Sequence, residues 1–298
     1  MNDIPKPLLK WVGGKSQIIE KILERFPYNI NNYYEPFIGG GSVLIGLLWL
    51  VKKNIISISG NIYASDVNKC LIHFYKTIQS NPDEFIVQLK HIITDYNSIK
   101  TDTKVNRSPL TKEDAFTSQE SYYYWIRKLF NSYPTKDDIR YAALFYFINK
   151  TCFRGIYREG PNGINVPFGH YKNVQIIDEQ HIKFISTLIQ FYVRSFDFLG
   201  SIQLVSDDFI YMDPPYAPEK TTSFVQYNKD GFDFSNHEKL FNICKSLPCK
   251  FLQSNANVAL VTNSFSDKRF KIEVIKCRRA INSKKPESTT EEVLISSN

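Results

Sequence analysis

The sequence predicts an α/β fold that is interrupted by a mainly helical insertion. Over residues 1–80, short apolar runs that end in glycine or aspartate alternate with helical patterns. The stretch 81–172 lacks this alternation, and strand patterns return over 173–298. We therefore expect a sheet domain built from 1–80 and 173–298, and an inserted domain built from 81–172.

Composition bounds the class of protein. The chain has 298 residues, of which 43% are hydrophobic and 14% aromatic, so it can bury a substantial core. No apolar run approaches the roughly 18 residues that span a bilayer, and the first residues lack the apolar core of a secretory signal. These features predict an intracellular, non-secreted protein with no membrane partner.

Net charge and cysteine usage narrow the possible partners and cofactors. The net charge of +7 is compatible with a polyanionic partner such as nucleic acid. The five cysteines are scattered and form no CxxC pair, so neither a disulfide framework nor a metal site is expected.

The first βα pattern contains a glycine-rich turn. Apolar residues at helical spacing predict a helix that starts near Ser16. The run 33–35 is typical of a strand, residues 36–41 (PFIGGG) of a turn, and 42–51 of an apolar helix. A glycine turn before a helix can hold the anionic end of a ligand and let the backbone approach it closely.

Two look-alike motifs fail. Gly14-Lys15-Ser16 resembles the end of a phosphate-binding P-loop, but Leu9 stands where that motif needs glycine. The turn at 39–41 supplies two glycines of a dinucleotide fingerprint, and the third falls on Leu44. These mismatches argue against a nucleoside triphosphatase and an NAD enzyme.

The next strand, 62–65, ends in an acid. Asp66 lies where a carboxylate in such folds accepts hydrogen bonds from ribose hydroxyls. The alternative is that Asp66 caps the helix predicted around 71–78. The residue alone does not separate the two interpretations.

The insertion carries two aromatic-rich helical patterns, 122–130 and 140–147, among long polar connections. After them, 153–158 and 164–166 are typical of two strands, and the turn 159–163 between them contains an Asn-Gly pair that favours a hairpin.

The last third returns to strands. We expect strands at 196–198, 209–212 and 259–262, and an antiparallel edge formed by 271–275 and 292–295.

Asp213-Pro214-Pro215-Tyr216 follows the apolar run 209–212, which places it at the carboxyl end of a buried strand. The alternative is a turn in which the prolines only end the strand. A conjugated exocyclic amine is a poor nucleophile, and the Asp213 carboxylate and Pro214 carbonyl can accept its two N–H bonds so that its lone pair faces a methyl donor. Tyr216 can stack on a base rotated out of a duplex.

Together these motifs resemble the Dam-like, alpha-class N6-adenine DNA methyltransferases. The resemblance is carried by six segments: KWVGGK at 10–15, EPFIGGGS at 35–42, Asp66, NKTCF at 149–153, NVPFG at 165–169 and DPPY at 213–216. It implies a Rossmann-like, S-adenosylmethionine-binding sheet formed by 1–80 and 173–298. It also implies that 81–172 is a target-recognition domain with a β-hairpin, and that the enzyme methylates adenine in double-stranded DNA after base flipping.

The resemblance also implies which residues bind the cofactor. Trp11 and Lys15 would contact its methionine part, and Asp66 its ribose. The other expected pocket residues are Glu35, Phe37, Gly39 and the pair Asp197 and Phe198 beside the adenine. Asp213, Pro214, Pro215 and Tyr216 would form the catalytic element.

For DNA, the resemblance implies that Lys10 contacts the duplex and that Phe153 wedges into the base stack. The remaining expected contacts are Lys150, Arg154, Ile156, Arg158, Pro167 and Tyr171. Any one of the basic residues alone is better explained by a solvated surface charge, and their clustering on a hairpin shifts the balance toward DNA.

One departure from the family concerns sequence choice. Family members that recognise GATC usually carry asparagine where this chain has Arg154, and an arginine can make two hydrogen bonds to guanine. The recognised site, a partner nuclease that shares it without binding the enzyme, and a monomeric or weakly dimeric state are expectations that the sequence leaves open. So are two alternatives, N4-cytosine methylation and a DNA-binding module without activity.

Overall fold

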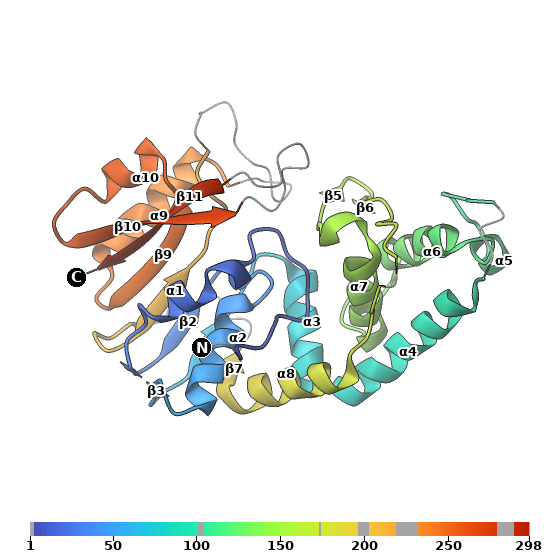
Figure 1. Ribbon diagram of the computed structural model, residues 1–298, viewed down its shortest axis with the longest axis horizontal. Coiled ribbons are helices and arrows are strands. Elements are labelled where there is room, and N and C mark those ends of the chain that lie inside the picture. The colour runs from blue at the N-terminus through green and yellow to red at the C-terminus, as the bar shows by residue number, and fades with distance from the viewer. Residues whose placement is uncertain are drawn as a thin grey trace.

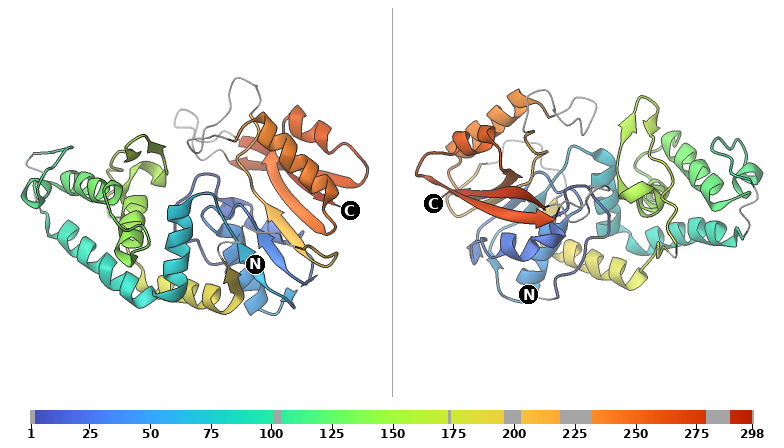
Figure 2. Two further views of the ribbon diagram at one scale, coloured as in Figure 1. Left: turned by 180° about the vertical axis from the view of Figure 1, so that it is seen from behind. Right: turned by 45° about the horizontal axis from the view of Figure 1, so that its top comes forward.

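A computed structural model describes residues 3–100, 104–172, 174–195, 203–218, 232–278 and 289–297. It confirms a mixed α/β fold. A sheet with its helices forms one side of the molecule, and the helices of the region after residue 81 stand to the other side (Figures 1 and 2). Within the described ranges, no helix combines the length and apolarity needed to cross a membrane.

Seven strands form the main sheet. Their spatial order is β10 (Phe270–Arg278), β11 (Thr289–Ser297), β9 (Lys250–Ala256), β8 (Phe209–Met212), β2 (Tyr33–Glu35), β4 (Ile62–Ala64) and β7 (Val193–Ser195). β11 pairs antiparallel with both of its neighbours, and every other pair is parallel. The expected antiparallel edge at 271–275 and 292–295 is therefore confirmed.

Helices cover the sheet and lead into its strands. They are η1 (Lys15–Gln17), α1 (Ile19–Leu23), α2 (Ser42–Lys52), α3 (Lys69–Ser80), α8 (Glu179–Tyr192), α9 (Phe234–Ser246) and α10 (Ala259–Ser264). A small parallel pair, β1 (Asn29–Ile30) and β3 (Ser57–Ile58), lies beside them. The helix predicted at 42–51 and the one around 71–78 are confirmed by α2 and α3.

The region after residue 81 contains α4 (Pro82–Ser98), α5 (Lys112–Ala115), α6 (Gln119–Asn131), α7 (Ile139–Thr151), the 3-10 turn η2 (Phe153–Gly155), β5 (Glu159–Gly160) and β6 (Gly163–Ile164). Helices α6 and α7 match the two aromatic patterns. Helix α4 was not predicted, although five of its residues are buried at helical spacing: Phe85, Ile86, Leu89, Ile92 and Tyr96.

Two strand predictions are wrong. Residues 259–262 belong to α10, and the strand that precedes them is β9. The run 153–158 begins with η2, in which Arg154 has φ 56°, so the strand pairing of this hairpin is short: it consists of β5 with β6, and an isolated antiparallel bridge joins Cys152 to Phe168. A positive φ interrupts the extended backbone that a strand at 153–158 would need.

The helical region and the sheet share one hydrophobic core. Phe74 of α3 stacks on Tyr146 of α7 with ring centroids 5.7 Å apart, and it meets Phe85 of α4 edge-on at 5.8 Å. One continuous cluster of buried residues joins α2 and α8 to α4, α6 and α7. The helical region is thus packed onto the sheet and not merely tethered to it.

Candidate active site

Three acidic residues meet at one edge of the sheet. Strands β4, β2 and β8 are parallel neighbours, so their carboxyl ends lie together. Glu35 ends β2, while Asp66 and Asp213 follow β4 and β8. The edge therefore gathers the acids that the sequence places at separate strand ends.

The glycine turn after β2 is braced by Asp66. Gly39 donates its N–H to one Asp66 carboxylate oxygen at 3.0 Å, and Asn68 donates its N–H to the other at 2.9 Å. The cap of α3 is Asn68, whose side chain accepts from the N–H of Leu71. The alternative that Asp66 caps this helix is therefore wrong. Burial raises the pKa of Asp66, and these backbone donors oppose the rise.

Aromatic side chains press on the same turn. Gly41 has φ 72°, and a Cβ there would overlap the hydroxyl of Tyr75, which donates to the Gly40 carbonyl at 2.8 Å. A Cβ on Gly40 would lie 2.8 Å from the Cβ of Trp11. Only glycines leave room for these approaches.

Lys15 reaches from the N-terminal loop to Asp213. Its Nζ lies 2.8 Å from Asp213 Oδ2, donates to the Gly13 carbonyl at 2.6 Å, and stands 4.8 Å from the ring centroid of Tyr216. Burial raises the pKa of Asp213 to about 6, although Lys15 pulls it down. Asp213 Oδ1 is shielded from solvent and has no hydrogen-bond partner among the described residues. One carboxylate oxygen is thus available to another donor.

Glu35 is buried, and its side chain forms a hydrogen bond within β2. The hydroxyl of Tyr33, two residues earlier and on the same face, donates to Glu35 at 2.7 Å. Burial raises the pKa of Glu35 to about 8, and the Tyr33 bond partly offsets the rise. Burial therefore favours the neutral form of the Glu35 carboxyl.

Glu292 and Asn255 hold the turn after β8, and the sequence gave no reason to select either of them. Tyr216 donates its hydroxyl to Glu292 of β11 at 2.7 Å, and Ala217 donates its N–H to the side-chain oxygen of Asn255 in β9 at 3.0 Å. Both contacts join residues far apart in the chain, so no local sequence motif predicts them.

The N-terminal loop is clasped to the end of α7. Asn149 accepts the N–H of Lys10 at 2.9 Å and donates to the Lys10 carbonyl at 2.7 Å. Trp11 stacks on Tyr157 with centroids 5.7 Å apart. The loop that carries Lys15 is therefore fixed to the helical region as well as to the sheet.

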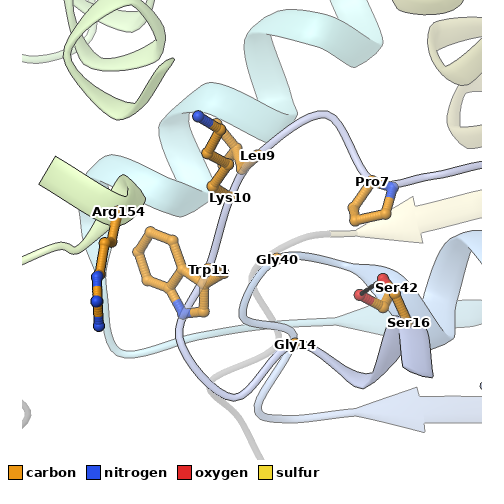
Figure 3. A pocket seen from close by; sticks show the side chains of 9 residues that line it. All are labelled: Pro7, Leu9, Lys10, Trp11, Gly14, Ser16, Gly40, Ser42 and Arg154. Carbon is orange, nitrogen blue, oxygen red and sulfur yellow. Dashed lines mark hydrogen bonds between the residues drawn. The ribbon is translucent and has the colours of Figure 1, made fainter. Parts of the chain in front are cut away.

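A pocket of about 260 Å³ lies against this loop. Its lining comes from three parts of the chain (Figure 3): Pro7, Leu9, Lys10, Trp11, Gly14 and Ser16 of the N-terminal loop, Gly40 and Ser42 of the glycine turn, and Arg154 after α7. Phe37, on the same turn, is half-buried and meets Phe232 edge-on at 6.2 Å.

The expected DNA contacts gather after α7. Lys10 Nζ stands 4.0 Å over the Tyr171 ring and donates to the Lys150 carbonyl. Burial lowers the pKa of Lys150 to about 8, and the nearby Lys10 charge adds to the effect. Phe153 donates its N–H to the Pro167 carbonyl at 2.8 Å. The structure thus brings Lys10, Lys150, Phe153, Pro167 and Tyr171 together.

The remaining contacts differ in exposure. Phe153 is 44% exposed, and the Arg154 guanidinium lies 5.2 Å from its ring. Arg158 is exposed and donates twice to Asn165, at 2.7 and 3.0 Å. Ile156 packs against the core.

Two of the expected cofactor residues, Asp197 and Phe198, lie outside the described residues.

Comparison with known proteins identifies relatives over nearly the whole chain. A family model described as D12 class N6 adenine-specific DNA methyltransferase matches residues 11–281. The type II methyltransferase M.MjaIII of Methanocaldococcus jannaschii is 34% identical, with 94% of this chain and 93% of the relative covered. The type II methyltransferase M1.LlaDCHI of Lactococcus lactis is 29% identical, with 92% and 88% covered. A DNA adenine methylase of Haemophilus influenzae is 28% identical, with 95% and 89% covered.

Proposed function

This chain belongs to the D12 class of N6-adenine-specific DNA methyltransferases, and we propose that its transfer of a methyl group from S-adenosylmethionine to adenine N6 is centred on Asp213-Pro214-Pro215-Tyr216. The observation that carries the proposal is Asp213 Oδ1, a shielded carboxylate oxygen without a described partner at the edge where the glycine turn lies. A buried acceptor left unpaired costs about 1–3 kcal/mol, which a substrate N–H would recover.

The residues at this edge fit S-adenosylmethionine. Each Asp66 oxygen receives one backbone N–H and keeps lone-pair capacity for a ribose hydroxyl. The positive-φ turn at Gly39 and Gly41 precedes the amino end of α2, which favours a carboxylate. Phe37 offers an aromatic surface beside the turn, and Trp11 packs against Gly39 and Gly40. When bound, the sulfonium cofactor supplies an activated methyl group.

In this proposal, Asp213 Oδ1 accepts one N–H of the adenine amine and the Pro214 carbonyl accepts the second. The lone pair is then directed out of the ring plane. Lys15 holds the carboxylate through Oδ2 alone, which leaves Oδ1 free to receive the amine. Tyr216 provides the stacking surface, and the two prolines remove backbone donors that would compete for the acceptors.

Glu35 supports the site in its neutral form. An ionised carboxylate there would repel Asp213 across the edge, and its raised pKa of about 8 avoids this at neutral pH. We assign it to the cofactor pocket with Trp11, Lys15, Phe37, Gly39 and Asp66, and we keep Asp197 and Phe198 as expected members.

We propose that 81–172 recognises the target sequence and that 1–80 and 173–298 form the catalytic domain. The support is the gathering of Lys10, Lys150, Phe153, Arg154, Ile156, Arg158, Pro167 and Tyr171 around η2, β5 and β6. The exposed Phe153 ring has the shape of a wedge that fills the stack when the adenine flips out.

The backbone conformation at Arg154 gives a physical reason why family members that recognise GATC usually carry asparagine at this position. Its φ of 56° is a left-handed conformation that asparagine adopts readily and that costs other residues about 1–2 kcal/mol. Family members with asparagine at this position avoid that cost. Arg154 holds its guanidinium beside Phe153, where it can reach a base or a phosphate.

Two of the relatives are named type II methyltransferases. By this likeness we propose that the chain protects DNA from a nuclease that cuts the same sequence and does not bind the enzyme. A monomer or weak dimer fits this role.

The test is Asp213→Ala, measured as transfer of a labelled methyl group to DNA and as cofactor affinity by calorimetry. Transfer should fall by about 10³-fold or more, because the amine loses its acceptor, while cofactor affinity should change by less than about threefold. The matched control is Asp207→Ala, since Asp207 is exposed just before β8. An active Asp213→Ala enzyme would place the chemistry elsewhere.

A further inference from the structure

The hydroxyl of Tyr216 binds a residue that lies 76 positions later in the chain. It donates to Glu292 Oε2 at 2.7 Å. Glu292 is partly buried and belongs to β11, a strand outside every motif that defines the family resemblance. The Glu292 carboxylate therefore holds a residue of the proposed catalytic turn, and this raises the question of what the contact contributes.

The sheet topology explains how Glu292 reaches the site. Because β11 runs antiparallel between β9 and β10, it begins at the edge where the parallel strands end. Glu292 pairs opposite Ala256, the last residue of β9. The reversed strand thus brings the side chain of Glu292 level with the turn after β8.

Tyr216 is held from several directions. Asn255 of β9 accepts the N–H of Ala217, the next residue, and so fixes the backbone. Glu292 fixes the phenol end of the ring. The Lys15 ammonium stands over the ring at 4.8 Å while pairing with Asp213. The ring therefore has a defined plane relative to the Asp213 carboxylate.

We propose that Glu292 is a positioning residue for methyl transfer, which fixes the plane of the Tyr216 ring so that the flipped adenine stacks with its amine at Asp213. The inference rests on the proposed role of Asp213 to Tyr216. A ring free to rotate about its side-chain bonds would admit stacked bases whose amines miss the acceptor, and such misplacement lowers the rate at saturation.

The charge of Glu292 has a separate effect. Its carboxylate raises the pKa of Asp213 through space, after burial and against the opposing effect of Lys15. The titratable groups facing Asp213 are Lys15 from the N-terminal loop, Glu35 of β2, Tyr211 of β8, Tyr216 of the same turn and Glu292 of β11. Glu292 in turn faces Tyr211 of β8, Tyr216 and Cys277 of β10.

The first experiment is a double-mutant cycle in saturating cofactor and DNA. Tyr216→Phe and Glu292→Ala should each lower kcat by roughly tenfold, because each removes the same charge-assisted hydrogen bond. The double variant should also lose roughly tenfold rather than a hundredfold. Multiplicative losses, or single variants with unchanged kcat, would overturn the proposal.

The second experiment separates positioning from a merely structural contribution. Glu292→Gln keeps the size and an acceptor oxygen but removes the charge, so the acidic limb of the kcat/KM profile should move to lower pH. Structural damage would lower the plateau without moving the limb. A limb that stays in place would contradict the assigned contact between Glu292 and the reacting centre.

The matched control is Glu291→Gln, the same change one position earlier. Glu291 is exposed on the opposite face of β11, where it accepts from Asn257 at 2.8 Å. It should leave kcat and the pH limb unchanged. If Glu292→Ala does not fold, as judged by thermal unfolding, Glu292→Gln and Tyr216→Phe decide the matter. An inactive Asp213→Ala enzyme combined with unaffected Glu292 variants would reject this inference and keep the proposed function.

Discussion

At the carboxyl end of β8 the side chains are interlocked, whereas after α7 many of them reach solvent. Lys15 and Glu35 are almost completely buried, and each is committed to a partner. Phe153 and Arg158, by contrast, expose much of their surface, and Arg158 donates its side-chain hydrogen bonds to Asn165. With the roles proposed above, the difference teaches that the catalytic groups are fixed before substrate arrives, while the proposed sequence-reading groups are left to find their partners on the DNA.

The largest effect that tests this contrast is expected from Arg158→Ala. If Arg158 reads a base, methylation of the recognised sequence should fall by about 5- to 150-fold, which corresponds to the loss of about 1–3 kcal/mol of discrimination. The thermal unfolding temperature should stay unchanged, because the side chain is exposed. The measurement is transfer to duplexes that vary one base at a time, and a uniform drop across all of them would assign Arg158 to the phosphate backbone instead.

A smaller effect is expected at the buried end from Phe37→Ala. The ring is half-buried beside the glycine turn, and its loss should weaken cofactor binding by about tenfold, from about 1.5 kcal/mol of apolar burial. Calorimetric titration with S-adenosylmethionine checks this. Phe234→Ala, an exposed ring at the start of α9, is the control. Unchanged affinity in Phe37→Ala would move the pocket away from the turn.

The mildest perturbation is acidification. In the proposed mechanism the amine needs an ionised Asp213, whose pKa is raised to about 6, so the active form exists above that pH and is lost below it. In the pH profile, kcat/KM should be half-maximal near pH 6 and fall by about tenfold for each further unit. DNA binding without cofactor should keep its affinity across the same interval, because it depends on lysines and arginines. A profile flat down to pH 5 would show that Asp213 does not titrate in the free enzyme as its burial implies.

The accuracy of the fold prediction differs between strands, and the residues of each strand explain why. The run 209–212 was predicted as a strand, and all four of its residues are buried in β8. Strand β9 was not predicted, because its buried centre consists of the polar residues Gln253, Ser254 and Asn255. These residues interrupt the apolar pattern by which a buried strand is predicted. Residues 259–262 were then assigned to a strand, although tertiary context makes them helical.

The site shows the same division. Motifs along the chain located Asp66 and Asp213, because strand ends are visible in a sequence. The contacts of Glu292 with Tyr216 and of Asn149 with Lys10 were not predictable, because they join residues 76 and 139 positions apart. The left-handed backbone at Arg154 was also missed, since arginine gives no signal for it.

The aromatic packing of Phe74 on Tyr146 and Phe85 limits how this enzyme can be re-engineered. Replacing 81–172 with the equivalent segment of a relative would cut through one core and leave α3 facing foreign side chains. Core positions lose several kcal/mol when their neighbours no longer fit. A chimaera that tests the proposed recognition role should therefore exchange only the exposed residues after α7, or include the matching faces of α3 and α8.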